Sequence, residues 1–246
     1  ATTLHQSGIT PDPDAIYQAR ETMAEARADA FADIAMDLYT ANTVTEPYQP
    51  NAEQSGKRVF ANTMLAMITR RDGGAQATAQ YDAADNMNQQ SVALAQLIGT
   101  GNGDEKVAAF EAQWRQDRLV MDKWFGLQVM KAKPDDVAAT AARLTQHPDF
   151  THKNPNRFRA VFGPMISNHA GFHHASGAAY TLLADWLITL DPLNPQTTAR
   201  MCSAFQTWKR YDADRQTKIA VELDRILATP NLSRDTTEML TRIRNS

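Results

Sequence analysis

Three histidines within six residues form the group in this sequence that most directly suggests metal chemistry. They are His169, His173 and His174, in the stretch SNHAGFHH. Two histidines four residues apart lie on one face of a helix, which is how the zinc-peptidase motif His-Glu-x-x-His begins and ends. That motif needs a glutamate to take a proton from zinc-bound water, and Ala170 stands in its place, followed by the helix-weakening Gly171. We therefore predict no metal site and no catalytic residue, only a connection between helices. A zinc site at the three histidines is the alternative, which metal analysis of the purified chain would test.

The arginines near two expected helix starts suggest a second kind of chemistry, the binding of an anion. Arg157 and Arg159 lie in or just after the first turn of a helix that begins at Asn154-Pro155. Arg200 follows a second start, Asn194-Pro195, by about one and a half turns. The partial positive charge at a helix N-terminus disfavours cations, so these arginines need partners. The partner is either a carboxylate on a neighbouring helix or a bound anion such as a peptide carboxylate, which a guanidinium holds through two hydrogen bonds. The sequence leaves both alternatives open.

No other group of residues forms a recognisable catalytic motif. The chain lacks a nucleophile elbow, a phosphate-binding glycine loop and a cysteine-histidine zinc framework. The one cysteine, Cys202, lies on an apolar stripe, and we interpret it as a small core residue and not as a reactive thiol. The pairs Asp135/Asp136 and Asp212/Asp214 stand at expected helix starts, where they are predicted to cap free backbone N–H groups.

Composition limits the partners and the compartment. The chain has 246 residues, enough to bury a sizeable core, and its net charge of −3 suggests neither a nucleic-acid nor a membrane partner. A single cysteine excludes an internal disulfide framework and favours a reducing cytoplasm. The chain has no apolar run of transmembrane length and no signal-peptide pattern at its start. It begins without Met, as either a processed chain or a fragment would.

The elements that would position these residues are helices. Only 11 Gly and 11 Pro are present, helix-favouring residues are plentiful, and no segment has a convincing strand pattern. Apolar residues at helical spacing predict one buried face on each of two segments. The residues of these faces are Ile16, Met23, Ile34 and Leu38 in the first segment, and Ile219, Leu223 and Ile226 in the second.

Turn signals divide the chain into helices of ordinary length. Asp12-Pro13, Asn154-Pro155 and Asn194-Pro195 each place a polar cap before a proline that suits the first helical position. Residues 120–130 are apolar on most faces, which predicts a central helix, and the irregular residues 42–53 predict a surface crossing. Roughly ten helices with short spacers would pack on their neighbours in sequence, so we predict an all-α stack, solenoid-like and not a bundle. No strict repeat is visible.

Several motifs together resemble the C-terminal end of bacterial aminopeptidase N, in the same order and at similar separations. The similarity extends from about Asp12 to about Arg244, nearly the whole chain. The motifs are YDAADNM at 81–87, VMDKWF at 120–125, NPNRFRA at 154–160, Phe172-His173, SGAAY at 176–180, LNPQ at 193–196 and KRYD at 209–212.

The resemblance is to one domain of a multidomain zinc exopeptidase of the gluzincin class. The catalytic domain of that family carries His-Glu-x-x-His with a downstream Glu ligand, and a Gly-Ala-Met-Glu-Asn motif, none of which is present here. The resemblance therefore implies an armadillo/HEAT-like stack of antiparallel helices, an α-solenoid. Residues 1–246 would form a single C-terminal domain, with the catalytic and N-terminal domains absent from this chain.

The resemblance also implies a function. In the family this domain packs over the catalytic domain, closes the active site into an internal chamber and restricts access to peptides and unstructured chains. The expected parent is a cytoplasmic zinc aminopeptidase that removes N-terminal amino acids, and its zinc would lie in the absent catalytic domain. We expect the chain alone to be inactive and without a cofactor. Its expected partners are the catalytic domain of the same polypeptide and a peptide substrate, which Arg159 and Arg200 would meet on the chamber wall.

This chain also departs from the family pattern. The family typically has Gly-Ser-Gly-Tyr after the Phe-His pair, whereas this chain has SGAAY at 176–180, and His169 and His174 lie outside the pattern. Gly177 should preserve the turn. The alternative function is a free-standing α-helical repeat module that binds peptides or protein partners, favoured if no catalytic domain is encoded upstream in the same reading frame. A cap domain should expose an apolar patch where the catalytic domain docks.

Overall fold

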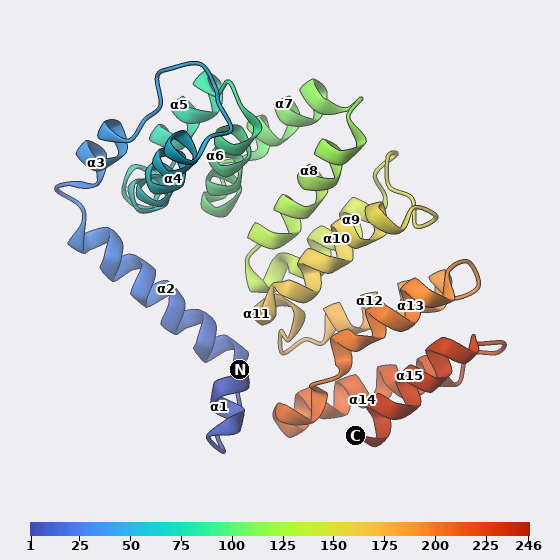
Figure 1. Ribbon diagram of the computed structural model, residues 1–246. Helices are drawn as coiled ribbons and strands as arrows, with labels where there is room; N and C mark the ends of the chain where they lie inside the picture. Colours follow the sequence, from blue (N-terminus) through green and yellow to red (C-terminus); the bar gives the residue numbers. More distant parts are fainter. The chain divides into compact units, whose positions relative to one another are not determined.

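The computed structural model describes residues 1–246 and contains only helices, turns and irregular segments (Figure 1). It has fifteen α-helices, three short 3-10 helices and no strand, so the predicted all-α class is confirmed. The helices fall into two compact units, one made of residues 1–17 and 132–246, and the other of residues 18–131. The expectation of a single domain over residues 1–246 stays a prediction. No helix is both long enough and apolar enough to span a membrane.

Residues 18–131 form a unit in which successive helices pack on one another. Its helices are α2 (Pro13–Ala30, which begins in the other unit), α3 (Ala35–Ala41), α4 (Ala52–Asp72), α5 (Ala75–Ala83), α6 (Met87–Thr100), α7 (Asp104–Trp114) and α8 (Arg118–Lys131). Helix α4 contacts α3, α5 and α6, and α6 contacts α7 and α8. Leu65 of α4, Ala77 of α5 and Leu97 of α6 meet in one buried core cluster. This order of contacts is that of a stack built from sequence neighbours.

Two predictions for this unit are confirmed. The central helix expected over residues 120–130 is α8, and its Trp124 and Phe125 are buried. The Trp124 indole N–H donates to the Val107 carbonyl of α7 at 2.8 Å, so the ring is both packed and satisfied. Residues 42–51 form the expected irregular crossing between α3 and α4.

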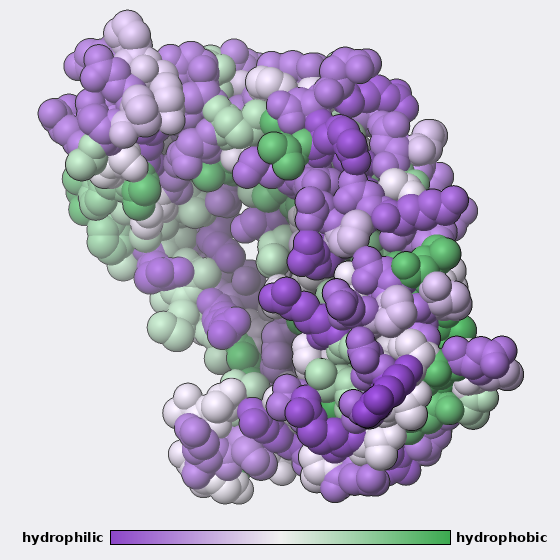
Figure 2. Space-filling view, turned by 45° about the vertical axis from the view of Figure 1, so that its right-hand side comes forward, coloured by the Kyte–Doolittle hydropathy of each residue, from purple (hydrophilic) through white to green (hydrophobic).

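The buried face predicted for residues 16–38 is wrong at two positions. Met23 of α2 is 66% exposed, and Ile34, which precedes α3, is 49% exposed. Within residues 18–131, α2 packs closely against no other helix, and ion pairs join it to α4, among them Arg70 to Glu21 at 3.1 Å. Amphipathic spacing indicates that one face of a helix is apolar, but it does not show which part of the polypeptide buries that face. On the face drawn in Figure 2, hydrophobic residues in green are exposed at several places among hydrophilic residues in purple.

Residues 1–17 and 132–246 form the other unit, which holds the histidines and arginines singled out above. Its helices are α1 (Thr2–Gln6), η1 (Pro134–Asp136), α9 (Val137–Thr145), α10 (Pro155–Ser167), α11 (His169–Phe172), α12 (Ala178–Leu190), α13 (Pro195–Cys202), η2 (Ser203–Phe205), η3 (Trp208–Arg210), α14 (Ala213–Leu227) and α15 (Arg234–Asn245). Helix α12 contacts α9, α13 and α14, and α15 contacts α13 and α14. The predicted buried face of Ile219, Leu223 and Ile226 is confirmed, and Cys202 is a buried core residue as expected.

The predicted helix starts are confirmed where a polar side chain precedes proline. Asp12 accepts from the Asp14 N–H at 2.9 Å, Asn154 from Asn156 at 3.0 Å, and Asn194 from Thr197 at 3.0 Å. These starts lie at α2, α10 and α13. A cap is a local interaction of a few residues, so it is well specified by sequence.

The capping prediction for the two aspartate pairs holds for only one pair. Asp212 caps α14 by accepting from the Arg215 N–H at 3.0 Å. Asp136 makes no side-chain cap, and Asp135 instead lies 3.1 Å from the ring nitrogen of His174. The difference arises because the chain enters α9 through the 3-10 turn η1, which places Asp135 outside the position that a cap requires.

Candidate functional site

The stretch SNHAGFHH contains a four-residue helix, α11, where a plain connection was expected. Asn168 caps it by accepting from the Gly171 N–H at 3.2 Å, and its amide donates to the Ala132 carbonyl at 3.0 Å. Gly171 is required by close packing, because a Cβ built there would lie 2.3 Å from Cγ2 of Val137 on α9. The glycine therefore allows α11 to pack closely against α9, which positions His169 at the start of α11 and His173 just after its end.

The three histidines have three different partners. His169 Nε2 lies 3.0 Å from the Tyr211 hydroxyl, His173 Nδ1 lies 2.8 Å from the Tyr180 hydroxyl, and His174 Nε2 lies 3.1 Å from Asp135. The rings of His169 and His173 approach edge to face, with centroids 5.0 Å apart. The imidazoles thus serve separate hydrogen bonds and do not converge on a common point.

Burial sets the protonation state of His173. Desolvation, with lesser contributions from His169 and Arg215, lowers the pKa of His173 to about 3, so the ring is neutral near pH 7. Burial also raises the pKa of Tyr180, which keeps its hydroxyl protonated. The neutral ring and the protonated hydroxyl therefore share one uncharged hydrogen bond, 2.8 Å long between Nδ1 and the hydroxyl oxygen.

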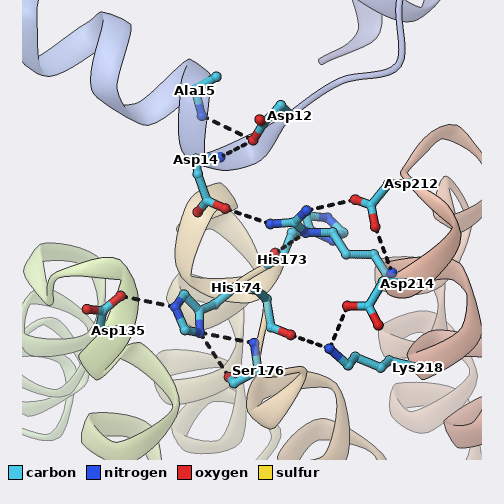
Figure 3. A network of polar contacts seen from close by, with 12 residues as sticks. Asp12, Asp14, Ala15, Asp135, His173, His174, Ser176, Asp212, Asp214 and Lys218 are labelled. Atoms are coloured by element: carbon cyan, nitrogen blue, oxygen red, sulfur yellow. Dashed lines mark hydrogen bonds and ion pairs between the residues drawn. The ribbon is translucent and has the colours of Figure 1, made fainter.

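Arg215 holds the segment that follows α11 in place. Its Nε donates to the His173 carbonyl at 2.6 Å, Nη1 to Asp212 at 2.7 Å and Nη2 to Asp14 at 2.7 Å. Figure 3 shows Asp14, Asp212 and His173 converging on this point from three separate elements. Arg215 is only 8% exposed, so each of its charged N–H groups needs such a partner. The next residues are held as well, because Lys218 donates to the Ala175 carbonyl and to Asp214.

His174 takes part in an Asp-His-Ser arrangement that resembles a hydrolase triad in residue types only. Nε2 of His174 faces Asp135, and Nδ1 lies 2.9 Å from the Ser176 hydroxyl (Figure 3). The Ser176 oxygen accepts from the Ala178 N–H at 3.3 Å, and the neighbouring Gly177 N–H donates to the His174 carbonyl. The Asp135 side chain is 83% exposed, so the pair is open to water. These contacts organise the first turn of α12, and the N–H groups of Gly177 and Ala178, which follow the serine, are already hydrogen-bonded and do not form an oxyanion hole.

A pocket of about 440 Å³ lies beside α11 in this unit. It is lined by parts of α1, α10, α11, α13, η2 and η3, including His169, His173, Arg200, Arg210 and Tyr211. No aspartate or glutamate is among its lining residues. Neither guanidinium lies within 4.0 Å of a carboxylate oxygen, so the pocket carries two positive charges without a protein counter-ion.

The structure separates the two arginines that the sequence placed on a chamber wall. Arg200 lines the pocket, whereas Arg159 is exposed on α10 and outside it. Arg159 donates to the Pro155 carbonyl at 3.1 Å and to the Asn156 side chain at 2.7 Å, contacts within its own helix start. The nearby Arg157 is buried and donates to the Asp149 carbonyl at 2.8 Å. Arg210 is the lining cation that sequence reasoning did not select, although it lies in the KRYD motif quoted for the resemblance.

The fold and the pocket define a class, a helical domain of armadillo type with a cationic pocket and no catalytic motif. Residues 1–245 match the family described as "Domain of unknown function (DUF3458_C) ARM repeats". The chain therefore belongs to that family. The predicted armadillo-like stack is confirmed by this match.

Known relatives extend the comparison. The chain is 32% identical to aminopeptidase N of Caulobacter vibrioides over 93% of its length, 35% to that of Haemophilus influenzae over 96%, and 33% to that of Escherichia coli over 94%. It spans only 27% of each of these relatives. The crystal structure of Legionella pneumophila aminopeptidase A in complex with aspartic acid is similar with a TM-score of 0.87 at 25% identity, over 96% of this chain and 29% of that one. The resemblance to the C-terminal helical domain of aminopeptidase N is confirmed.

Proposed function

We propose that the chain is the C-terminal cap domain of a zinc-dependent aminopeptidase that removes N-terminal amino acids from peptides. The observation that carries the proposal is the alignment of nearly the whole chain with 27% of three aminopeptidases N. Because the chain has no His-Glu-x-x-His motif, its part in the reaction is to shape the space around the substrate. Residues 1–246 act as a single domain that closes and lines the substrate chamber and gates access to it.

The chemistry belongs to the rest of the parent polypeptide. In this proposal the catalytic zinc and its ligands lie in the catalytic domain, and this chain contributes no cofactor and no catalytic residue. The partners are that catalytic domain and the peptide substrate. The setting is cytoplasmic, which the single buried Cys202 supports because no disulfide is available to the chain.

Arg159 and Arg200 are the proposed substrate-binding residues of the chamber wall. Both side chains are exposed, and neither has a carboxylate partner within 4.0 Å. An ion pair with a neighbouring helix was the structural alternative for each of them, and the contacts described above contain no such pair. Exposed guanidiniums without a counter-ion are suited to the carboxylate or backbone oxygens of a peptide.

The docking face for the catalytic domain is proposed to lie on α2, α3 and α4. Six of the eleven large apolar side chains that are exposed lie between residues 23 and 60. They include Met23 at 66%, Val59 at 61% and Phe60 at 41% exposure. Such a concentration supports a surface that another part of the polypeptide covers, and about three quarters of the length of the relatives lies outside the matched region.

The proposal is tested by assaying the chain, its parent and the parent without residues 1–246 side by side. The substrates are an amino-acid p-nitroanilide and a decapeptide, with zinc present. We expect no turnover by the chain alone, and a change in the ratio of decapeptide to p-nitroanilide hydrolysis when the parent loses it. Turnover by the pure chain would refute the proposal. A reading frame that encodes no zinc peptidase segment would also refute it and would leave the free-standing binding module.

The arginine roles are tested in the parent with Arg159→Gln and Arg200→Gln. Each is expected to lower kcat/KM for the decapeptide by about tenfold, because a charge-assisted hydrogen bond is lost, and to leave the p-nitroanilide rate unchanged. The matched control is Arg242→Gln, an exposed arginine on α15 whose side chain contacts only Met239. An equal loss in the control would assign the effect to net charge and contradict the chamber-wall role.

A further inference from the structure

We propose that the pocket beside α11 binds the C-terminal carboxylate of a short peptide, with Arg210 as a second guanidinium beside Arg200. The inference rests on the proposed function for the source of the peptide, but the pocket itself lies wholly within residues 1–17 and 132–246. Arg210 is half-buried on η3, and Arg200 is exposed near the end of α13. Both line the cavity.

Arg200 and Arg210 line one cavity without a counter-ion, whereas several other arginines of the same unit form ion pairs. Acidic residues outnumber basic ones, 28 to 25, so partners are plentiful. Arg215 contacts two carboxylates, Arg225 contacts Asp185 and Glu222, and Arg244 contacts Asp224. Arg200 and Arg210 face a cavity with no acidic lining residue. Two uncompensated guanidiniums at one concave site favour an anion, and a planar fork favours a carboxylate.

His173 forms part of the pocket wall without contributing charge. His173 is neutral, because burial lowers its pKa to about 3. Its ring stacks near Tyr211, with centroids 4.0 Å apart, and the Tyr211 hydroxyl is in turn held by His169 at 3.0 Å. His173 therefore adds no positive charge to that of the arginines, and the stacked rings form a side wall of the pocket.

The size and the apolar part of the pocket identify the kind of ligand. A volume of about 440 Å³ is that of a small-molecule site and much exceeds the volume of an inorganic anion. Ile166, Phe172, Met201 and Ala204 provide apolar lining in addition to the cations. This combination suits a C-terminal residue with an apolar side chain, whose carboxylate meets the arginines. A peptide bound in this way would be recognised by its free end, so chains that are too long to place that end here would lose the contact.

The test is a binding measurement on the 246-residue chain by isothermal titration calorimetry at low ionic strength. The probes are Gly-Gly-Leu, the same tripeptide with a C-terminal amide, and inorganic phosphate. We expect the free acid to bind about tenfold or more tightly than the amide, because charge-assisted hydrogen bonds are lost in the amide. Phosphate is expected to bind more weakly than the free acid. Equal affinity for acid and amide, or a stronger affinity for phosphate, would overturn the inference.

Variants locate the site. Arg210→Gln and Arg200→Gln are each expected to weaken binding of the free acid by about tenfold. The matched control is Lys209→Gln, which changes the charge equally at the neighbouring exposed position outside the lining. Neither arginine has an ion pair to lose, and unchanged thermal unfolding of each variant confirms the fold. Full retention of affinity in Arg210→Gln, or an equal loss in Lys209→Gln, would overturn the assignment.

The binding test and the test of the proposed function can refute their two proposals independently. Equal binding of the tripeptide acid and its amide would overturn the pocket assignment. The cap role would still be tested by the ratio of decapeptide to p-nitroanilide hydrolysis in the parent and its truncated form. A reading frame without a peptidase would overturn the cap role, while carboxylate-dependent binding by the chain would still establish the pocket.

Discussion

Replacing Arg215 with methionine should destabilise the unit formed by residues 1–17 and 132–246. Methionine keeps the length of the aliphatic stem but removes the guanidinium, which binds the His173 carbonyl, Asp212 and Asp14 at 2.6, 2.7 and 2.7 Å. Arg215 joins elements that are up to 201 residues apart in sequence. Its loss therefore acts on the tertiary arrangement around α11 and not on one helix.

The size of the effect follows from which partners water can reach. The Asp14 and Asp212 side chains are 51% and 40% exposed, so water replaces the guanidinium and each pair contributes up to about 1 kcal/mol. His173 is only 5% exposed, and its carbonyl loses a charge-assisted bond worth about 1–3 kcal/mol. We expect a total loss of about 3 kcal/mol. For a chain of this size, that corresponds to a decrease in Tm of about 6–12 °C.

The assay is urea unfolding followed by circular dichroism, with thermal unfolding as a second measure. Asp14→Asn, which leaves the His173 carbonyl satisfied, should cost under about 1 kcal/mol. Arg234→Met is the control, because the Arg234 side chain is 88% exposed and pairs only with Glu238. It should leave the unfolding midpoint unchanged. If Arg215→Met destabilised the chain no more than Asp14→Asn does, the argument from the buried carbonyl would be wrong.

Two further predictions concern the same region. Because burial lowers the pKa of His173 to about 3 from 6.5, the unfolded chain binds a proton that the folded chain rejects, and stability present above pH 6.5 is lost as the pH falls toward 3. The free energy of unfolding should change with pH by a slope that approaches about 1.4 kcal/mol per pH unit. His173→Gln should remove this pH dependence, as measured by urea unfolding between pH 7 and 5. An unchanged slope in the variant would contradict the assignment. Gly171→Ala should cost about 1–3 kcal/mol, because the new Cβ would lie 2.3 Å from Val137, and Val137→Ala in the same chain should restore part of the loss. Destabilisation by Gly171→Ala that Val137→Ala does not relieve would mean that a different contact is responsible.

The features that could be predicted from the sequence are those determined by a few neighbouring residues. The caps at Asp12, Asn154 and Asn194 and the buried face of α14 depend on short-range geometry or on one periodic stripe. The family resemblance extends prediction beyond local features, because motifs that occur in the same order in related chains indicate the same fold. The resemblance predicts that Arg200 lies on the wall of a substrate chamber, and in the structure Arg200 lines a pocket.

The features that could not be predicted depend on contacts between distant segments. Nothing local to Asp14 indicates that Arg215 binds it, and the exposure of Met23 arises because no helix of residues 18–131 packs closely against α2. Arg210 is the last residue of the short 3-10 helix η3, so no α-helical face indicates the direction of its side chain. Gly171 was interpreted as a helix breaker, whereas the structure shows that the approach of Val137 requires it.

The arginines of this unit show why residue type and helix position do not decide between structure and recognition. Arg215 lies in the first turn of its helix and Arg159 just after the first turn of another, where the helix dipole disfavours cations. Arg215 is buried, so it must satisfy each N–H within the protein, and its three partners make it a structural residue. Arg200 and Arg210 remain hydrated, so they need no protein partner and can exchange water for a ligand. Burial, which is a property of the folded chain, therefore separates the structural role of Arg215 from the recognition that we propose for the exposed, unpaired cations.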